Sequence, residues 1–340
     1  MTPTPGETDV SIALGADAAP AIPGLRFRRF RGDDDYAELA DLISTTNLAD
    51  GIDEIRDAAT VKFEYEHASG FDPRFDIAFA EMDGGLIGYG DADRSVREGV
   101  AVYRTGGTVH PAWRRRGLGR ALLRINERRL REIAAGRDDP GGRVFGSWID
   151  DLQGGAVQLL EAEGYHPVRY FFAMRRPSLG DLPDAPLPDG LEIRPVRPED
   201  HRAIYDADVE AFLDHWGARE RTEEDFVAMF AAPYTDTSLW RVAWDDDQVA
   251  GSVMPTIWRT ENERLGIHRA WLEHISVRRP WRRRGLARAL IVSALEGLRE
   301  VGIDDAMLGV DAENPTGALG LYESLGFVVK DRGSSWRKAW

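Results

Sequence analysis

The sequence predicts an α/β (α+β) fold that occurs twice in tandem. At 340 residues the chain is long for one hydrophobic core, and chains of this length usually divide into two domains. Both halves show the same order of predicted elements, and the Arg/Gly-rich segment 109–122 aligns without a gap with 277–290. These observations favour the duplication of one α/β domain.

Composition places the domain boundaries. Residues 1–23 are rich in Pro, Ala, Gly and Thr without periodicity, so we expect a flexible leader there. Prolines interrupt residues 177–189, where they break helices and remove backbone donors, so this stretch is predicted to be a linker. The chain should therefore hold an N-terminal domain over 24–176 and a C-terminal domain over 190–340.

Each predicted domain starts with the same three elements. A short alternating strand comes first, at 24–28 and 190–194. A helix follows, with acidic residues near its N-terminus as the helix dipole favours, over 33–43 and 199–212. A hairpin comes next, and its strands are 75–79 with 86–89 in the first half and 239–244 with 249–255 in the second.

Bulk properties narrow the function. Hydrophobic residues make up 43% and charged residues 30%, which is typical of a globular protein with a buried core. The absence of cysteine excludes disulfides, Cys-ligated metal and a cysteinyl acyl-enzyme. The formal charge of -15 opposes binding to nucleic acid or anionic lipid and favours cationic small molecules. With no secretory or membrane-spanning pattern, we expect a cytoplasmic protein.

The duplicated Arg/Gly segments carry the first chemical signal. A strand, a short turn and an amphipathic helix bring backbone N–H groups and the positive helix end together, which suits a pyrophosphate. Glycine at 117, 119 and 285 would let phosphate oxygens approach the main chain. The candidate binding residues are Val109, Arg114, Arg115, Arg116, Gly117, Leu118, Gly119 and Arg120 in the first copy, and Arg282, Arg283, Arg284, Gly285, Leu286, Ala287 and Arg288 in the second.

These segments resemble the GNAT superfamily of acyl-CoA N-acyltransferases. The family signature Q/R-x-x-G-x-G/A matches residues 114–119 and 282–287. A second hallmark is a strand followed by Asn, a helix with Tyr and a Gly-Phe end, which matches residues 307–327 with Asn314 and Tyr322. The resemblance implies a mixed, mostly antiparallel central sheet flanked by helices in each domain. It also implies acetyl-CoA as acyl donor and no metal.

The resemblance assigns roles in the second copy. Asn314 would contact the pantetheine or phosphate arm, and Tyr322 would protonate the leaving thiolate. In the family, carboxylates on the fourth strand draw the amine proton through water, which indicates Glu273 as the base. Strand alternation places Glu273 on one face with Ile275 and Val277. The backbone N–H near Val277 would hydrogen-bond the acetyl carbonyl.

One alternative base stays open. His274 is predicted to lie on the opposite face of the strand from Glu273 and would be a structural residue or a rival base.

The first copy departs from the pattern. Thr105 aligns with Glu273, Leu160 with Tyr322, and Leu152-Gln153 replaces the Asn-Pro pair. The N-terminal domain is therefore predicted to be non-catalytic, and it either binds acyl-CoA as a structural or regulatory ligand or is empty.

The sequence predicts an N-acetyltransferase that acts on a primary amine of a small cationic molecule, such as an aminoglycoside, aminosugar or polyamine, by direct attack in a ternary complex. Carboxylates and aromatics of the C-terminal domain are the candidates for holding the acceptor, namely Asp208, Glu210, Asp214 and 333–336.

Alternatives remain at this point. The two-domain arrangement also resembles the mycothiol synthase family, whose acceptor is an aminosugar-linked cysteine amine. A peptide N-acetyltransferase, a non-catalytic acyl-CoA sensor and, against the acidic charge, a nucleic-acid-binding protein are the others. The expected partner is the small-molecule amine, and neither nucleic acid nor a membrane is expected to bind. Formation of a homodimer is left open.

Overall fold

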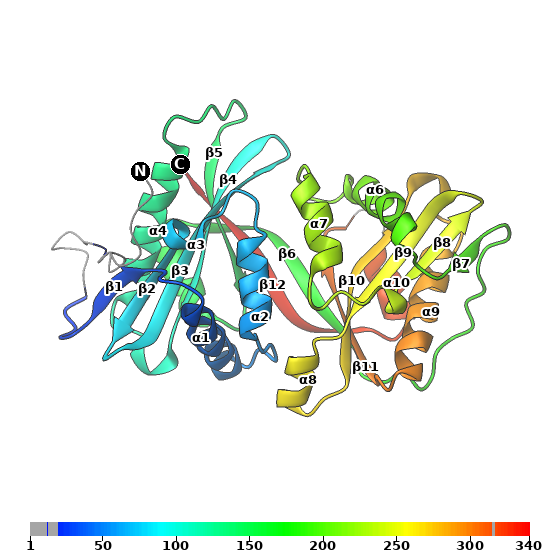
Figure 1. Cartoon of the computed structure of the whole chain (residues 1–340), viewed down its shortest axis with the longest axis horizontal. Coiled ribbons are helices and arrows are strands. Elements are labelled where there is room, and N and C mark those ends of the chain that lie inside the picture. The colour runs from blue at the N-terminus through cyan, green and yellow to red at the C-terminus, as the bar shows by residue number, and fades with distance from the viewer. Residues whose placement is uncertain (1–11, 13–19, 315–316) are drawn as a thin grey trace. The chain divides into compact units, whose positions relative to one another are not determined.

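The computed structural model describes Ile12 and residues 20–314 and 317–340, which divide into two compact units (Figure 1). Unit 1 comprises the chain up to Val168 together with Ser334–Trp340, and unit 2 comprises Arg169–Gly333. Each unit has a sheet with helices packed on it, which confirms the predicted α/β class. No helix within the described ranges is long and apolar enough to cross a membrane.

The strands of the unit 1 sheet, in spatial order, are β1 (Arg26–Arg29), β2 (Ile77–Met82), β3 (Gly85–Arg97), β4 (Val100–Val109) and β5 (Arg143–Asp150), next to which lies the end of β12 (Val328–Ala339). The pairs β1–β2, β2–β3 and β3–β4 are antiparallel, and the pair β4–β5 is parallel. Its helices are α1 (Asp34–Asp50), α2 (Ala58–Glu66), α3 (Pro73–Asp76), α4 (Leu118–Ala134) and α5 (Gly154–Ala162), with a 3-10 turn η1 (Pro111–Trp113).

Helices cover both faces of the unit 1 sheet. Successive side chains of a strand point to opposite faces, and on β2 Ala78 and Ala80 pack in a cluster with α4. Ile77 and Phe79 pack instead with residues of α1 and α2. Both sets are buried, so β2 lies inside a layer of helix, sheet and helix.

Unit 2 repeats this plan. Its strands, in spatial order, are β6 (His166–Arg176, in unit 2 from Arg169), β11 (Asp305–Asp311), β10 (Arg269–Val277), β9 (Gln248–Thr256), β8 (Arg241–Asp245) and β7 (Glu192–Arg194). Its helices are α6 (His201–Phe212), α7 (Glu223–Ala231), α8 (Arg259–Leu265), α9 (Leu286–Glu300) and α10 (Ala318–Ser324), with 3-10 turns η2 (Pro198–Asp200), η3 (Thr237–Leu239) and η4 (Arg279–Trp281). The pair β10–β11 is parallel, whereas the pairs β6–β11, β10–β9, β9–β8 and β8–β7 are antiparallel.

The predicted strands, helices and hairpins are confirmed, with shifts of a few residues at their ends. The first helix continues to Asp50, beyond the predicted end at residue 43, and stops where Gly51 takes the left-handed conformation, with φ of 81°. In the first hairpin Asp83 and Gly84 both have positive φ, 51° and 83°, as a tight hairpin turn between twisted strands requires.

The unit boundaries differ from those expected from the sequence, because strands cross from one half of the chain to the other unit. Most of β6, which ends the first half, pairs with β11 of unit 2. The predicted linker 177–189 also lies in unit 2, where Leu179 is 1% exposed and belongs to the hydrophobic core. The stretch is therefore packed, because its apolar residues contact the hydrophobic core of unit 2.

The predicted flexible leader falls mostly on residues 1–11 and 13–19, which lie outside the described residues. Ile12 is described, and its N–H donates to the carbonyl of Phe27 at 2.8 Å. Ile12 and Ile22 pack against the cluster that includes Phe27 and Leu118.

The last strand, β12 (Val328–Ala339), ends in unit 1. Trp336 is 4% exposed in a cluster with Tyr103 and Phe145, and the ring of Trp340 stacks on Phe145 at a centroid distance of 4.5 Å. The ammonium of Lys338 pairs with Glu127 of α4 at 2.7 Å. The C-terminal residues thus complete the core of the N-terminal unit.

We expect Trp336→Ala to lower the free energy of unfolding of unit 1 by about 3–5 kcal/mol, because it removes a large buried ring and leaves a cavity. Calorimetry of the full chain, analysed for separate transitions of the two units, would measure this. Val328→Ala, at a 58% exposed position of the same strand, is the control and should change little. An equal effect of the two variants would contradict this role of β12.

Candidate active site

Two parallel strands separate in the middle of unit 2. The pairing of β10 with β11 runs from Arg269–Asp305 to Trp271–Met307 and then stops, although β10 continues to Val277. On its other edge β10 stays paired with β9, and the N–H of Arg278 donates to Ala250 at 3.0 Å. Hydrogen-bonding direction alternates along an antiparallel pair, so the backbone of Ile275 and Val277 faces the side where β11 has separated. From the sequence, the acetyl carbonyl is predicted to bind at this open edge.

The turn after β10 has the shape expected of an anion cradle. Arg283 and Gly285 take left-handed conformations, with φ of 63° and 88°, and α9 starts at Leu286 without a side-chain cap. The N–H groups of the first helical turn, from Leu286 to Arg288, therefore remain available to a ligand. Unit 1 has the same turn, since Arg115 and Gly117 have φ of 62° and 87° before α4.

The first arginine of each triplet has its hydrogen-bond partners within the chain itself, namely a backbone carbonyl and a carboxylate. The Nε of Arg282 donates to the Val277 carbonyl at 2.9 Å, and its Nη1 pairs with Asp214 at 2.6 Å. Arg114 makes the same contacts with Val109 and Asp50.

The other arginines of the segments have varied neighbours. Arg115 donates to Gln158, Arg120 pairs with Glu163, Arg288 donates to Ser324, the guanidinium of Arg116 lies over the ring of Trp113, and Arg283 and Arg284 are exposed.

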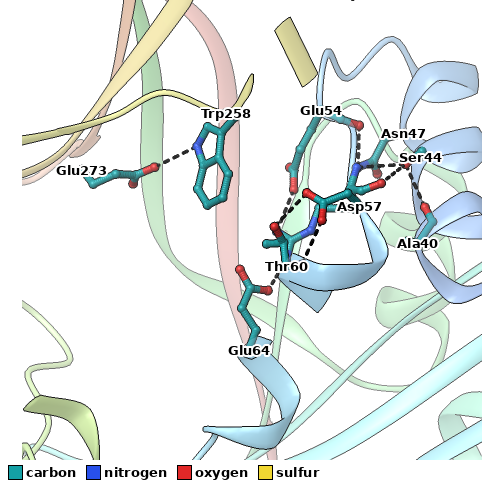
Figure 2. A network of polar contacts seen from close by, with 10 residues as sticks. Ala40, Ser44, Asn47, Glu54, Asp57, Thr60, Glu64, Trp258 and Glu273 are labelled. Atoms are coloured by element: carbon teal, nitrogen blue, oxygen red, sulfur yellow. Dashed lines mark hydrogen bonds and ion pairs between the residues drawn. The ribbon is translucent and has the colours of Figure 1, made fainter. Parts of the chain in front are cut away.

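Glu273 is exposed at a bulge of β10. The register with β9 shifts between Leu272 and His274, which leaves Glu273 as the extra residue. The sequence predicted that Glu273 shares a face of the strand with Ile275 and Val277. The bulge interrupts the alternation of side chains on which that prediction rested. Figure 2 shows the indole of Trp258, which donates to the Glu273 carboxylate at 3.3 Å. The ring of Tyr234 lies 4.6 Å from that of Trp258.

His274, the other base considered, contacts a buried carboxylate. Its Nδ1 lies 2.8 Å from Oδ2 of Asp208, which is 4% exposed, and its ring packs near Phe212 of α6. Burial lowers the pKa of His274, but the charge and hydrogen bond of Asp208 outweigh this, so the pKa is raised overall. The second oxygen of Asp208 is buried without a hydrogen-bond partner within the described residues.

Tyr322 lies on α10 and is 7% exposed, with Phe327 against its ring. Burial raises the pKa of its phenol to about 12, so the hydroxyl keeps its proton at neutral pH. The helix begins later than the sequence suggested, since Gly317 is the N-cap and α10 starts at Ala318. Asn314 precedes it, and the predicted first helical residue, Pro315, lies outside the described residues.

The three acidic residues expected at the acceptor site are already paired. Asp208 binds His274, Glu210 binds Arg278, and Asp214 binds both Arg279 and Arg282. Each of these carboxylates thus contacts a basic side chain that β10 or the turn after it brings against α6, and their role in holding a substrate ammonium stays a prediction. Trp336, also expected there, is buried in the core of unit 1.

Sequence reasoning missed a cavity in unit 1. It measures about 360 Å³ and opens where β4 and β5 separate, after the pair Arg104–Gly146. Gly119, Leu122 and Leu160 are among its lining residues. Leu160 occupies the position of Tyr322, because Tyr165 N–H donates to Leu160 as Phe327 N–H donates to Tyr322.

The second substituted position, Thr105, is held by the side chain of Asn126 at 2.8 Å. The small residues at 106, 107 and 119 were the signal that this half also encloses space. No cluster of three metal-ligating side chains occurs in the part of the chain that the structure describes.

Residues 201–327 match the acetyltransferase (GNAT) family. The mycothiol acetyltransferase of Geodermatophilus obscurus is 29% identical over 302 residues, which cover 88% of this chain and 92% of that protein. The mycothiol acetyltransferase of Salinispora tropica is 31% identical over 298 residues, which cover 86% and 90%.

Solved structures agree with these matches. A GCN5-related N-acetyltransferase from Sphaerobacter thermophilus aligns with a TM-score of 0.70 and 28% identity, covering 93% of this chain and 96% of that one. A tandem GNAT protein from the clavulanic acid biosynthesis pathway aligns with a TM-score of 0.64 and 18% identity, covering 92% and 98%. The second likeness is one of fold.

Titration of the histidines by NMR tests the electrostatics of this site. We expect the imidazole of His274 to titrate above the ordinary value of 6.5, and that of His215, which burial and Arg282 affect, below it. The charged groups that act on His274 are Asp208, Arg221 and Glu273, so Asp208→Asn should lower its pKa most.

The sign of the stability effect follows from this shift. Because the folded-state pKa of His274 is raised, its contribution is complete below the unfolded value of 6.5 and is lost as the pH rises through the folded value. The unfolding free energy of wild type minus that of His274→Asn should therefore fall between slightly acidic and slightly alkaline pH. A difference that is constant with pH, or a His274 pKa unchanged in Asp208→Asn, would contradict the pairing.

Proposed function

Since the chain belongs to the GNAT acetyltransferase family, we propose that unit 2 transfers acetyl from acetyl-CoA to a primary amine of a small cationic molecule. Membership in the family makes the protein an acyl-CoA-dependent N-acyltransferase. The acetyl group, the acceptor class and the assignment of catalysis to unit 2 are the proposed parts.

The observation that carries the proposal is the open edge of β10. It combines backbone donors facing the gap at Ile275 and Val277, an uncapped start of α9, and a protonated phenol at Tyr322. A thioester carbonyl that accepts the Val277 N–H would be polarised, and the uncapped N–H groups of α9 would bind the pyrophosphate. The same turn occurs in unit 1, but only unit 2 adds the two side chains for proton transfer.

Direct attack in a ternary complex balances with these groups. Glu273 accepts a proton from the substrate ammonium, directly or through water, and the amine nitrogen forms its bond to the acetyl carbon. The Val277 N–H stabilises the oxyanion while the carbon–sulfur bond breaks. The nitrogen loses its second proton to solvent as the amide forms, while Tyr322 donates its proton to the departing sulfur and is reprotonated from solvent. No acyl-enzyme is needed, and the chain has no cysteine to form one.

An exposed carboxylate beside aromatic rings supports a cationic acceptor. Glu273 lies against Trp258, whose ring is close to Tyr234, and none of the three is buried. An ammonium group is attracted by both a carboxylate and aromatic faces. The flat rings would also pack on a sugar, which suits an aminosugar acceptor.

A second candidate acceptor follows from the relatives named mycothiol acetyltransferase, which match most of this chain. By that likeness the amine would belong to a cysteine linked to an aminosugar. Both candidates use the same donor site and proton transfers, so an acceptor panel separates them.

For unit 1 we propose binding of acyl-CoA without transfer. The cavity and the Arg/Gly turn support binding, since Gly119 lines the cavity and Gly117 takes the left-handed conformation just before α4 starts. Leu160 and Thr105 replace the phenol and the carboxylate of unit 2, which supports the lack of transfer.

We expect Glu273→Gln and Tyr322→Phe each to lower kcat/KM by about 10²-fold or more, because each removes one proton-transfer group. Release of free thiol from acetyl-CoA, measured with polyamines, aminoglycosides, aminosugars and cysteinyl aminosugars, is the assay. Glu296→Gln, at an exposed site of α9, is the matched control and should retain activity.

His274→Asn belongs in the same series. A loss in this variant with full activity in Glu273→Gln would make His274 the base and refute the role of Glu273. Tight binding of acetyl-CoA with no turnover on any amine would instead favour a sensor.

Calorimetric titration with CoA tests unit 1. We expect two sites per chain in the wild type and one in Gly155→Trp, because Gly155 lines the cavity and has open space that an indole would fill. Gly154→Trp is the matched control, since the neighbouring glycine also has open space but does not line the cavity. Turnover should be unchanged in both variants. One site in the wild type, or a loss of turnover in Gly155→Trp alone, would count against the proposal for unit 1.

A further inference from the structure

One arginine of unit 2 joins three parts of the acyl-CoA site. The Nε of Arg282 donates to the carbonyl of Val277 at 2.9 Å, its Nη1 pairs with Asp214 at 2.6 Å, and its Nη2 donates to the Ala211 carbonyl at 3.3 Å. These contacts connect the end of β10, the turn before α9 and the end of α6. The guanidinium therefore already has a carboxylate and two carbonyls as partners.

The same arrangement occurs in unit 1. The Nε of Arg114 donates to the Val109 carbonyl at 3.1 Å, and its two terminal nitrogens pair with the two oxygens of Asp50 at 2.6 and 2.8 Å. Val109 ends β4 as Val277 ends β10. The two units differ at both proton-transfer positions, yet each keeps the arginine, the carbonyl and the carboxylate.

We propose that Arg282 is a positioning residue that acts through Val277 and is held by Asp214, rather than a ligand of the CoA phosphates. The inference rests on the proposed function, because Val277 is taken as the donor to the thioester oxygen. In unit 1, Arg114 and Asp50 do the same for Val109.

Physical reasons support this role. In an extended strand the N–H and C=O of one residue point to the same edge, so the Val277 carbonyl faces the same gap as its N–H. An unpaired carbonyl there would repel the thioester oxygen and leave a polar group without a partner. Arg282 satisfies this carbonyl and fixes the peptide orientation. Asp214 neutralises the guanidinium, so little of its charge is left for a phosphate.

A phosphate ligand and a positioning residue predict opposite effects of Asp214→Asn. If Arg282 bound phosphate, removal of the carboxylate would release its charge and strengthen CoA binding. If Arg282 positions Val277, removal of the carboxylate loosens the guanidinium and lowers catalysis. The two side chains then act as one unit, so the double variant should lose no more than either single variant.

The experiment compares full-length wild type, Asp214→Asn, Arg282→Gln and the double variant. Steady-state kcat and KM for acetyl-CoA come from thiol release, and the Kd for CoA comes from calorimetry in the Gly155→Trp background. We expect kcat to fall roughly tenfold or more in all three variants, with a smaller change in Kd. Arg279→Gln is the matched control, because Arg279 also pairs with Asp214 but is 75% exposed, and it should behave as wild type.

Two results would overturn the inference: CoA binding as tight as wild type or tighter in Asp214→Asn with normal kcat, or losses that add in the double variant. If the wild type binds CoA without turnover, the proposed function fails and Kd alone decides. Weaker binding in Asp214→Asn then supports the positioning role, and equal or tighter binding rejects it.

Arg282→Lys covers the case in which Arg282→Gln does not fold. Lysine keeps the charge but cannot donate to Val277 and Asp214 in the same planar geometry. We expect a loss of kcat close to that of Asp214→Asn, whereas full activity would show that charge alone suffices and would reject the inference.

Discussion

The early end of one parallel strand pairing determines the rest of each unit. β10 leaves β11 after Trp271, and β4 leaves β5 after Arg104, so several backbone groups lose their ladder partners in the middle of a sheet. Buried backbone donors and acceptors must be satisfied in some other way. Here an arginine takes the carbonyl at the strand end in both units, and the N–H groups beside it remain for a ligand. The incomplete sheet therefore leaves a gap with backbone donors at its edge, and this is where we propose that acyl-CoA binds.

Two copies of this scaffold support different sites. The proposed proton-transfer residues of unit 2 are Glu273 and Tyr322, and the residues aligned with them in unit 1 are Thr105 and Leu160. The fold tolerates this divergence because the turn, the helix start and the arginine contacts form the cradle without the proton-transfer side chains. Under the proposed function, binding and catalysis depend on separate sets of residues, so one copy can lack the second set while it keeps the first.

The two units are not independent segments of sequence. The chain leaves unit 1 within β6 and returns to it within β12, so each unit contains strand residues from both halves of the chain. Trp336 and Trp340 pack in unit 1 although they lie 171 and 175 residues after Tyr165 of the first half. Contacts this distant in sequence connect the stability of the N-terminal unit to the end of the chain.

The sequence by itself determined the repeated α/β fold, the Arg/Gly turns and the loss of Glu273 and Tyr322 equivalents in the first copy, because periodicity, glycine and alignment are local signals. Tertiary structure decided where Trp336 lies, which carboxylates are free, and that β10 bulges at Glu273. From the sequence, Asp214 is a candidate for holding the acceptor, but in the fold it forms ion pairs with Arg279 and Arg282. Pairing of this kind depends on distances between elements far apart in the chain, which no local pattern records.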